Sequence, residues 1–431
     1  MARLERGDLL PRIVTDIPGP EARRLSERIR DVEAPGINTL YGDRPNIFMR
    51  EALGANVLDV DGNRYLDLTA GFGVASIGHR HPRIVRALQA QSEELIHALG
   101  DAVGHPVRIE LARRLARLSP IPDSRVYLAV SGSDAVEIAV KTALLHHGGR
   151  RDRILAFHPA YHGLTLGSLN LSSRDDFRRP FKAHLHPELD RLPYGCDIQQ
   201  VDDLLASRRQ AALVVEPIVG REGVLVPPIG WLRGLCDVAR RHGTLVVVDE
   251  IFTGFGRTGR WFDLQHDEAR PDLVCCGKAL AGGMPLAAVL GSAELLSVWK
   301  TSGEALHTAT FVAHPPSCAA ALAALDVMEE ENLPARAESL GRVVAERAAD
   351  WPRRFTALTD LRGRGLLWGL ELEPKAAERW TREAWSRGIL MLCGGPEGRV
   401  AQIVPPLTIS RDQLDHALTT LEEILQRLSS R

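Results

Sequence analysis

Lys278 is the residue of this sequence whose surroundings most clearly favour chemistry. It follows the apolar residues 273–276, and the glycine pair Gly282-Gly283 lies a few residues beyond it. A lysine at the end of a buried strand is poorly hydrated, which favours its neutral, nucleophilic amine. The two glycines allow the backbone to come close to a group bound there. By itself, a lysine is more often exposed to solvent, so a second feature is needed.

That second feature is Asp249, which closes the apolar run 244–248. Open parallel sheets bind ligands at the carboxyl ends of their strands, where this carboxylate is expected. An unpaired buried carboxylate is costly, so Asp249 needs a cationic partner. Lys278 lies 29 residues further along the chain, about the length of one strand–helix–strand unit. The two strand ends can therefore meet in one crevice.

A third feature is the sequence Ser131-Gly132-Ser133 between an apolar run and a helical pattern. The free N–H groups and the dipole at the start of a helix favour a phosphate, although a capped helix without a ligand is the commoner case. An anion-binding helix start, a buried carboxylate and a buried lysine together describe a pyridoxal phosphate site. The lysine would form the imine, Asp249 would hold the pyridinium N–H, and the helix would hold the phosphate.

The elements that must position these residues alternate between helix and strand. Short apolar strands are expected at residues 126–130, 154–157, 212–215, 244–248, 273–276 and 288–290. Such a pattern predicts an α/β fold with a mostly parallel sheet covered by helices on both faces. We expect an N-terminal arm and part of a small domain at residues 1–75, with a hairpin around Asp61-Gly62. A large cofactor-binding domain would follow at 76–320, and a small α+β domain at 321–431.

Composition narrows the class of protein. The chain has 431 residues, 45% of them hydrophobic, and a net charge of −2 from 53 basic and 55 acidic residues. This balance does not suggest binding to nucleic acid or to a membrane surface. The six cysteines show no CxxC spacing, so neither disulfides nor a metal site is expected. The N-terminus lacks the apolar core of a signal peptide, which favours a soluble, cytoplasmic protein.

Several motifs, in order along nearly the whole chain, make the sequence resemble the class III aminotransferases, which are fold-type I pyridoxal phosphate enzymes. Two segments carry most of the resemblance: 249–259 (DEIFTGFGRTG) and 271–283 (PDLVCCGKALAGG). Other matching segments are 71–82, 131–137, 161–163, 216–217, 310–315 and 404–409. The resemblance implies a seven-stranded sheet in the large domain, pyridoxal 5′-phosphate as the cofactor, and a homodimer with shared active sites.

The resemblance also implies roles for single residues. The cofactor-binding residues would be Ser131, Gly132, Ser133, Tyr161, His162, Asp249, Ile251, Lys278 and Thr310. Lys278 would hold the cofactor and move a proton, with Asp249 keeping the pyridine nitrogen protonated. Tyr161 and Ile251 would lie on the two faces of its ring. Thr310 would reach the phosphate bound by the neighbouring subunit. Glu216, at another strand end, is expected to gate the substrate pocket.

Three positions depart from the family pattern. Members that act on amino acids clamp substrate carboxylates with arginines, whose planar fork suits that group. One such arginine commonly lies three residues before the proline of the C-terminal motif, where this chain has Gln402. Another follows the His-Gly of the tyrosine motif, where this chain has Leu164. Phe252 replaces a frequent glutamine. A carboxylate could instead be reached by Arg221, unless that residue is a solvated loop arginine.

These observations predict an aminotransferase that takes a small-molecule amine and a carbonyl acceptor. The favoured donor is a terminal amine, on a diamine, an amino sugar or a longer ω-amino acid. Within the family, an aminomutase or a decarboxylating enzyme remains an alternative. From another class, the chain could be a pyridoxal phosphate-binding regulatory protein without turnover. The sequence alone does not name the substrate pair.

Overall fold

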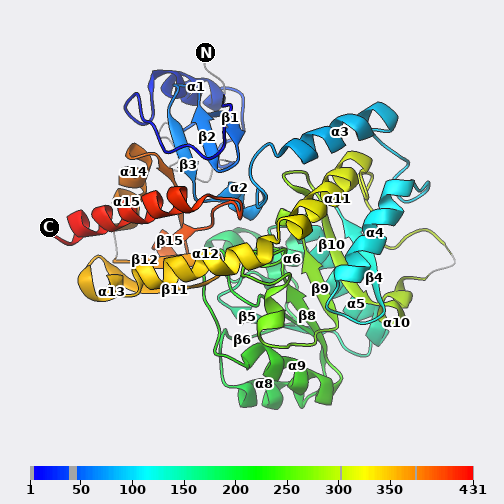
Figure 1. Ribbon diagram of the computed structural model, residues 1–431. Coiled ribbons are helices and arrows are strands. Elements are labelled where there is room, and N and C mark those ends of the chain that lie inside the picture. The colour runs from blue at the N-terminus through cyan, green and yellow to red at the C-terminus, as the bar shows by residue number, and fades with distance from the viewer. Residues whose placement is uncertain (1–3, 38–45, 301–302, 374–375, 431) are drawn as a thin grey trace. The chain divides into compact units, whose positions relative to one another are not determined.

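The computed structural model describes residues 4–37, 46–300, 303–373 and 376–430. The chain forms two compact units (Figure 1). The central unit comprises Pro82–Gly341 and Arg362–Leu367. The terminal unit comprises Met1–His81, Arg342–Leu361 and Trp368–Arg431, and so joins segments from both ends of the sequence.

A seven-stranded sheet forms the core of the central unit. Its strands lie in the order β4 (Ser124–Ala129), β10 (Ala287–Ser292), β9 (Leu273–Cys276), β8 (Leu245–Asp249), β7 (Gln210–Val215), β5 (Arg153–His158) and β6 (Leu189–Pro193). β10 pairs antiparallel with both of its neighbours. The pairs from β9 across to β6 are parallel. The carboxyl ends of β7, β8 and β9 therefore lie at the same edge of the sheet.

Helices cover both faces of this sheet. Ala212 of β7 belongs to the core cluster that includes the buried face of α5 (Gly132–His147). The next residue, Leu213, points to the opposite face and is also fully buried. On that face the ring of Phe157 lies 5.2 Å from the ring of Trp231 in α9 (Trp231–His242). The other α-helices described in this unit are α3 (Pro82–Glu94), α4 (Pro106–Leu118), α6 (Leu166–Leu171), α7 (Asp175–Arg178), α8 (Ile198–Leu205), α10 (Ala293–Leu296) and α11 (Pro315–Glu330).

The terminal unit is built around two small sheets. One has the order β1 (Met49–Leu53), β2 (Asn56–Asp59), β3 (Arg64–Asp67) and β13 (Ile389–Leu390). The other has the order β11 (Leu358–Arg364), β12 (Leu367–Leu372), β15 (Val400–Ile403) and β14 (Leu392–Gly394). The end of β11, from Arg362, and the first residue of β12, Leu367, are assigned to the central unit. Its α-helices include α1 (Pro20–Arg30), α2 (Ala70–Gly73), α13 (Trp351–Arg354), α14 (Ala376–Ser386) and α15 (Arg411–Ser429), and the unit boundary falls inside α12 (Leu333–Ala348).

The predicted fold class is confirmed, including the seven-stranded, mostly parallel sheet and the smaller α+β unit. Six of the seven strands were expected from their apolar runs. β6 was not, because it lies at the edge of the sheet and its sequence Leu-Asp-Arg-Leu-Pro is only half-buried. Lys278 does not end a strand but begins a 3₁₀ turn, Lys278–Ala281, after β9 has ended at Cys276. The expected domain boundaries after residues 75 and 320 stay a prediction.

None of the helices that the structure describes combines the length and apolar character that a membrane span requires. Within the same described residues, no group of three or more His, Cys, Asp or Glu side chains could hold a metal ion. The six cysteines are free thiols, and Cys275 and Cys276 are buried in β9.

Candidate active site

Lys278 occupies a strained, half-buried position. Its backbone φ is 41°, in the left-handed region that a residue with a side chain rarely adopts. Its Nζ atom lies 3.9 Å from the centre of the Phe252 ring. Burial lowers the pKa of Lys278 to about 8, against the opposing effect of Asp249 and Glu216. The amine is therefore neutral in a usable fraction of molecules near neutral pH, where an ordinary lysine is almost wholly charged.

Asp249, the last residue of β8, is buried and forms a pair with His162. Its Oδ2 atom lies 2.8 Å from Nδ1 of the histidine, and its Oδ1 atom accepts a hydrogen bond from the N–H of Ile251. Burial opposes a charge on His162, but the hydrogen bond and the charge of Asp249 outweigh it and raise the pKa of the histidine. His162 therefore binds a proton more readily than burial alone would allow, and it orients the carboxylate. It acts through Asp249, and sequence patterns could not reveal a contact across 87 residues.

The start of α5 presents free N–H groups. Ser131 caps this helix by accepting a hydrogen bond from the N–H of Asp134, so its hydroxyl already has a donor. The N–H groups of Gly132 and Ser133 make no hydrogen bond with any residue that the structure describes. A Cβ atom on Gly132 would lie 3.0 Å from the side chain of Ile251. The glycine thus lets the helix start come close to the loop after β8.

Glu216 follows β7 and organises the next loop. Its two carboxylate oxygens accept hydrogen bonds from the N–H groups of Tyr161 and Gly220, at 2.8 and 3.1 Å. Burial raises the pKa of Glu216 to about 7, and the nearby charge of Asp249 contributes to the rise. A Cβ atom on Gly220 would lie only 2.0 Å from the ring of Phe252. Glu216 therefore ties the loop after β7 to Tyr161, beside the Phe252 ring that covers Lys278.

Three of the predicted residues remain: Leu164, Thr310 and Gln402. Leu164 is 50% exposed, and its N–H donates to the hydroxyl of Ser133. Thr310 is exposed, in the loop before α11. Gln402 is half-buried in β15 and belongs to the terminal unit. Arg257 had no expected role although it stands in the motif 249–259; it is 1% exposed and its charge helps to lower the pKa of Lys278.

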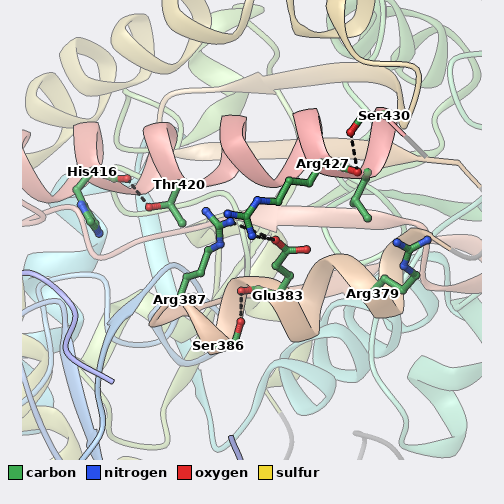
Figure 2. A pocket seen from close by; sticks show the side chains of 9 residues that line it. Arg379, Glu383, Ser386, Arg387, His416, Thr420, Arg427 and Ser430 are labelled. Atoms are coloured by element: carbon green, nitrogen blue, oxygen red, sulfur yellow. Dashed lines mark hydrogen bonds and ion pairs between the residues drawn. The ribbon is translucent and has the colours of Figure 1, made fainter. Parts of the chain in front are cut away.

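A separate cleft of about 820 Å³ lies between α14 and α15 in the terminal unit (Figure 2). None of the predicted site residues lines it. Arg387 and Arg427 both point at Glu383 and pair with it, at 3.2 and 3.3 Å. These ion pairs neutralise part of the positive charge, and the cleft contains no lysine. We therefore do not assign the chemistry to it.

Comparison with known proteins identifies the family. The model of the family "Aminotransferase class-III" matches residues 40–425. The alanine/serine racemase of Pyrococcus horikoshii is 34% identical, with 96% of this chain and 93% of the relative covered. The acetylornithine aminotransferase of Methanopyrus kandleri is 37% identical, with 86% and 92% covered. The solved ornithine aminotransferase of Toxoplasma gondii superposes with a TM-score of 0.86 at 31% identity, over 94% of this chain and 95% of its own.

The Toxoplasma gondii structure holds pyridoxal phosphate in its active site at partial occupancy, and the residues of this chain fit the same cofactor. Imine formation requires a neutral amine, which the lowered pKa of Lys278 favours. The phosphate requires donors without partners, which the start of α5 provides at Gly132 and Ser133. A protonated ring nitrogen requires a buried carboxylate, and Asp249 is 5% exposed. This protein belongs to the class III aminotransferase family, and its cofactor is pyridoxal phosphate.

Proposed function

We propose that this enzyme takes the amino group of a terminal primary amine and passes it to a keto acid or an aldehyde. When bound, pyridoxal phosphate supplies an electron sink for the substrate carbon that loses its proton. Lys278 would hold the cofactor and then carry that proton. Asp249, oriented by His162, would keep the ring nitrogen protonated, and Gly132 and Ser133 would bind the phosphate.

The side chain at position 164 carries the proposal for the substrate. Leu164 is uncharged and half exposed, so it offers no partner to a carboxylate. Gln402, at the other expected clamp position, is also uncharged. A substrate carboxylate buried without a charged partner costs several kcal/mol. The relatives named for acetylornithine and ornithine support a reaction at an amine distant from a carboxylate.

A panel of amine donors tests this function. The holoenzyme is mixed with each donor and the absorbance change of its cofactor is followed, with diamines, amino sugars, ω-amino acids, α-amino acids and 4-aminobutyrate compared. Diamines, amino sugars and longer ω-amino acids should convert the cofactor fastest, and a free aldehyde or keto acid should appear. A preference for 4-aminobutyrate over all carboxylate-free amines by ~100-fold, about 2.7 kcal/mol, would contradict the proposal. Racemisation of alanine or serine without loss of amine would instead ally the enzyme with its Pyrococcus horikoshii relative.

We also propose a cytoplasmic homodimer in which Thr310 completes the phosphate site of the partner subunit. Thr310 and its neighbour Phe311, which is 63% exposed, offer a surface for a second copy. A two-fold interface makes each site depend on both chains. Sedimentation of a fully active monomer would refute the dimer, and recovery of the enzyme in a membrane or secreted fraction would refute the location.

A further inference from the structure

The loop after β7 holds Arg221 in a fixed position. Val219 and Leu225 exchange two backbone hydrogen bonds of 3.0 Å, which close residues 220–224 into a tight loop. The side chain of Arg362 donates to the carbonyl oxygens of Gly223 and Val224. Hydrogen bonds thus hold both ends of the loop, and Arg362 holds it again at Gly223 and Val224. The backbone of Arg221 therefore has little freedom.

Among the residues that the structure describes, the guanidinium of Arg221 has aromatic neighbours but no carboxylate paired with it. Its central carbon lies 4.8 Å from the ring centre of Tyr161 and 5.6 Å from that of Phe177. Its Nε atom is buried and makes no hydrogen bond with any described residue. Arg174 lies closer to the same ring, 4.3 Å from the centre of Phe177, but it is paired with Asp176. Aromatic faces orient a guanidinium without using its N–H donors.

The neighbouring Glu222 does not neutralise this charge. No ion pair joins it to Arg221 among the described residues, although its side chain is only 2% exposed. Burial raises the pKa of Glu222, against the lowering effect of Arg174 and Arg221. This carboxyl is therefore easier to protonate than that of an exposed glutamate. The guanidinium of Arg221 is therefore available to bind another anion.

Arg221 is also close to the reacting amine. Its charge contributes to the lowered pKa of Lys278 and opposes the raised pKa of Tyr161. Gly220, the residue before it, packs on Phe252, whose ring contacts Nζ of Lys278. An anion bound at Arg221 would therefore lie on the side of the site where Tyr161 lies. The side chains of Arg221 and Phe252 would separate it from the amine of Lys278.

We propose that Arg221 binds a carboxylate of the substrate, one that is separated by several carbons from the reacting amine. This inference rests on the proposed function and narrows it to ω-amino acids. The planar guanidinium, which lies near the rings of Tyr161 and Phe177, provides the paired donors that the uncharged side chain of Leu164 lacks. Because the group is already oriented, little ordering of the side chain opposes binding.

The test compares 5-aminopentanoate with pentylamine, which has the same carbon chain without the carboxylate. In the holoenzyme, we expect kcat/KM to be at least 30-fold higher for 5-aminopentanoate. Arg221→Met keeps the packing between the rings and should reduce this preference to less than 3-fold, through KM. Arg221→Lys keeps the charge but not the fork, and should lie between. The control Arg174→Gln, which alters the paired arginine beside Phe177, should keep the full preference.

Calorimetry with pentanoate gives a readout that needs no turnover. The wild-type holoenzyme should bind it, and Arg221→Met should weaken binding at least 10-fold, with its melting temperature recorded to exclude unfolding. An equal fall for both amines in a folded Arg221→Met variant would show a structural role only and overturn the inference. So would a wild-type enzyme that does not bind pentanoate. If the wild-type enzyme converts no amine at all, the proposed function fails, whereas pentanoate binding still reports on Arg221.

Discussion

Replacing Asp249 with asparagine removes one negative charge from the active site and preserves the shape of the side chain. The amide oxygen can still accept a hydrogen bond from the N–H of Ile251, and the amide nitrogen can face Nδ1 of His162. The charge, however, has no substitute at this 5% exposed position. Without it, burial dominates and lowers the pKa of His162. Loss of a pre-organised charge of this kind slows catalysis by about 10²–10³-fold, or about 3–4 kcal/mol.

The assay is a stopped-flow measurement of the first half-reaction with excess amine. Asp249→Asn should melt within a few degrees of the wild type and bind pyridoxal phosphate, yet convert it at least about 100-fold more slowly. Because the charge of Asp249 raises the pKa of Lys278, that pKa should also fall below its present value of about 8. A folded, cofactor-bound variant that reacts within threefold of the wild-type rate would show that the ring nitrogen has another partner.

Four further predictions concern residues around this pair. Borohydride reduction followed by peptide mapping should find the cofactor on Lys278, and a label on another lysine would refute its role; Lys278→Ala should lose turnover by orders of magnitude. Gly220→Ala should destabilise the protein by about 1–3 kcal/mol in chemical denaturation, because its Cβ atom would overlap the Phe252 ring; an unchanged midpoint would contradict this packing. Burial raises the pKa of Glu216 from its ordinary 4.5 to about 7, so the folded protein favours the neutral carboxyl and loses stability as the pH rises through this range. Glu216→Gln should therefore be more stable than the wild-type apoenzyme at pH 8, by up to about 3 kcal/mol, and equally stable near pH 4. Thr310→Ala and Lys278→Ala subunits, each nearly inactive alone, should recover up to about a quarter of wild-type activity when mixed, since half of the dimers then contain one intact site; no recovery would argue against a shared site.

The approach of Asp249 to the residues that follow β9 was predictable, because sheet geometry alone brings these segments together. β8 and β9 are parallel neighbours, with Asp249 opposite Cys275, so residues that follow their carboxyl ends must converge. An apolar run followed by a polar residue signals such a strand end in the sequence. The capping serine at 131 was predictable for the same kind of reason, since a helix start needs acceptors for its free N–H groups.

Contacts made by loops were not predictable from pattern. The hydrogen bond between His162 and Asp249 joins the loop after β5 to the end of β8, and no periodicity encodes that approach. The buried guanidinium of Arg257 donates to the carbonyl oxygen of Leu366, in the turn between β11 and β12, 109 residues away. The contact between Arg221 and the Tyr161 ring could not be predicted either. The sequence shows an arginine in a loop but not which rings the loop brings to it.

Phe252 shows how the structure changes the meaning of a substitution. In the sequence, its replacement of a glutamine indicates only a lost hydrogen bond to the cofactor. In the structure, the ring lies 3.9 Å from Nζ of Lys278, where a charged amine gains about 1 kcal/mol from the aromatic face. Burial acts in the opposite direction and lowers the pKa from 10.5 to about 8, which corresponds to about 3 kcal/mol. Burial is the larger effect, so the amine remains easier to deprotonate than an ordinary lysine.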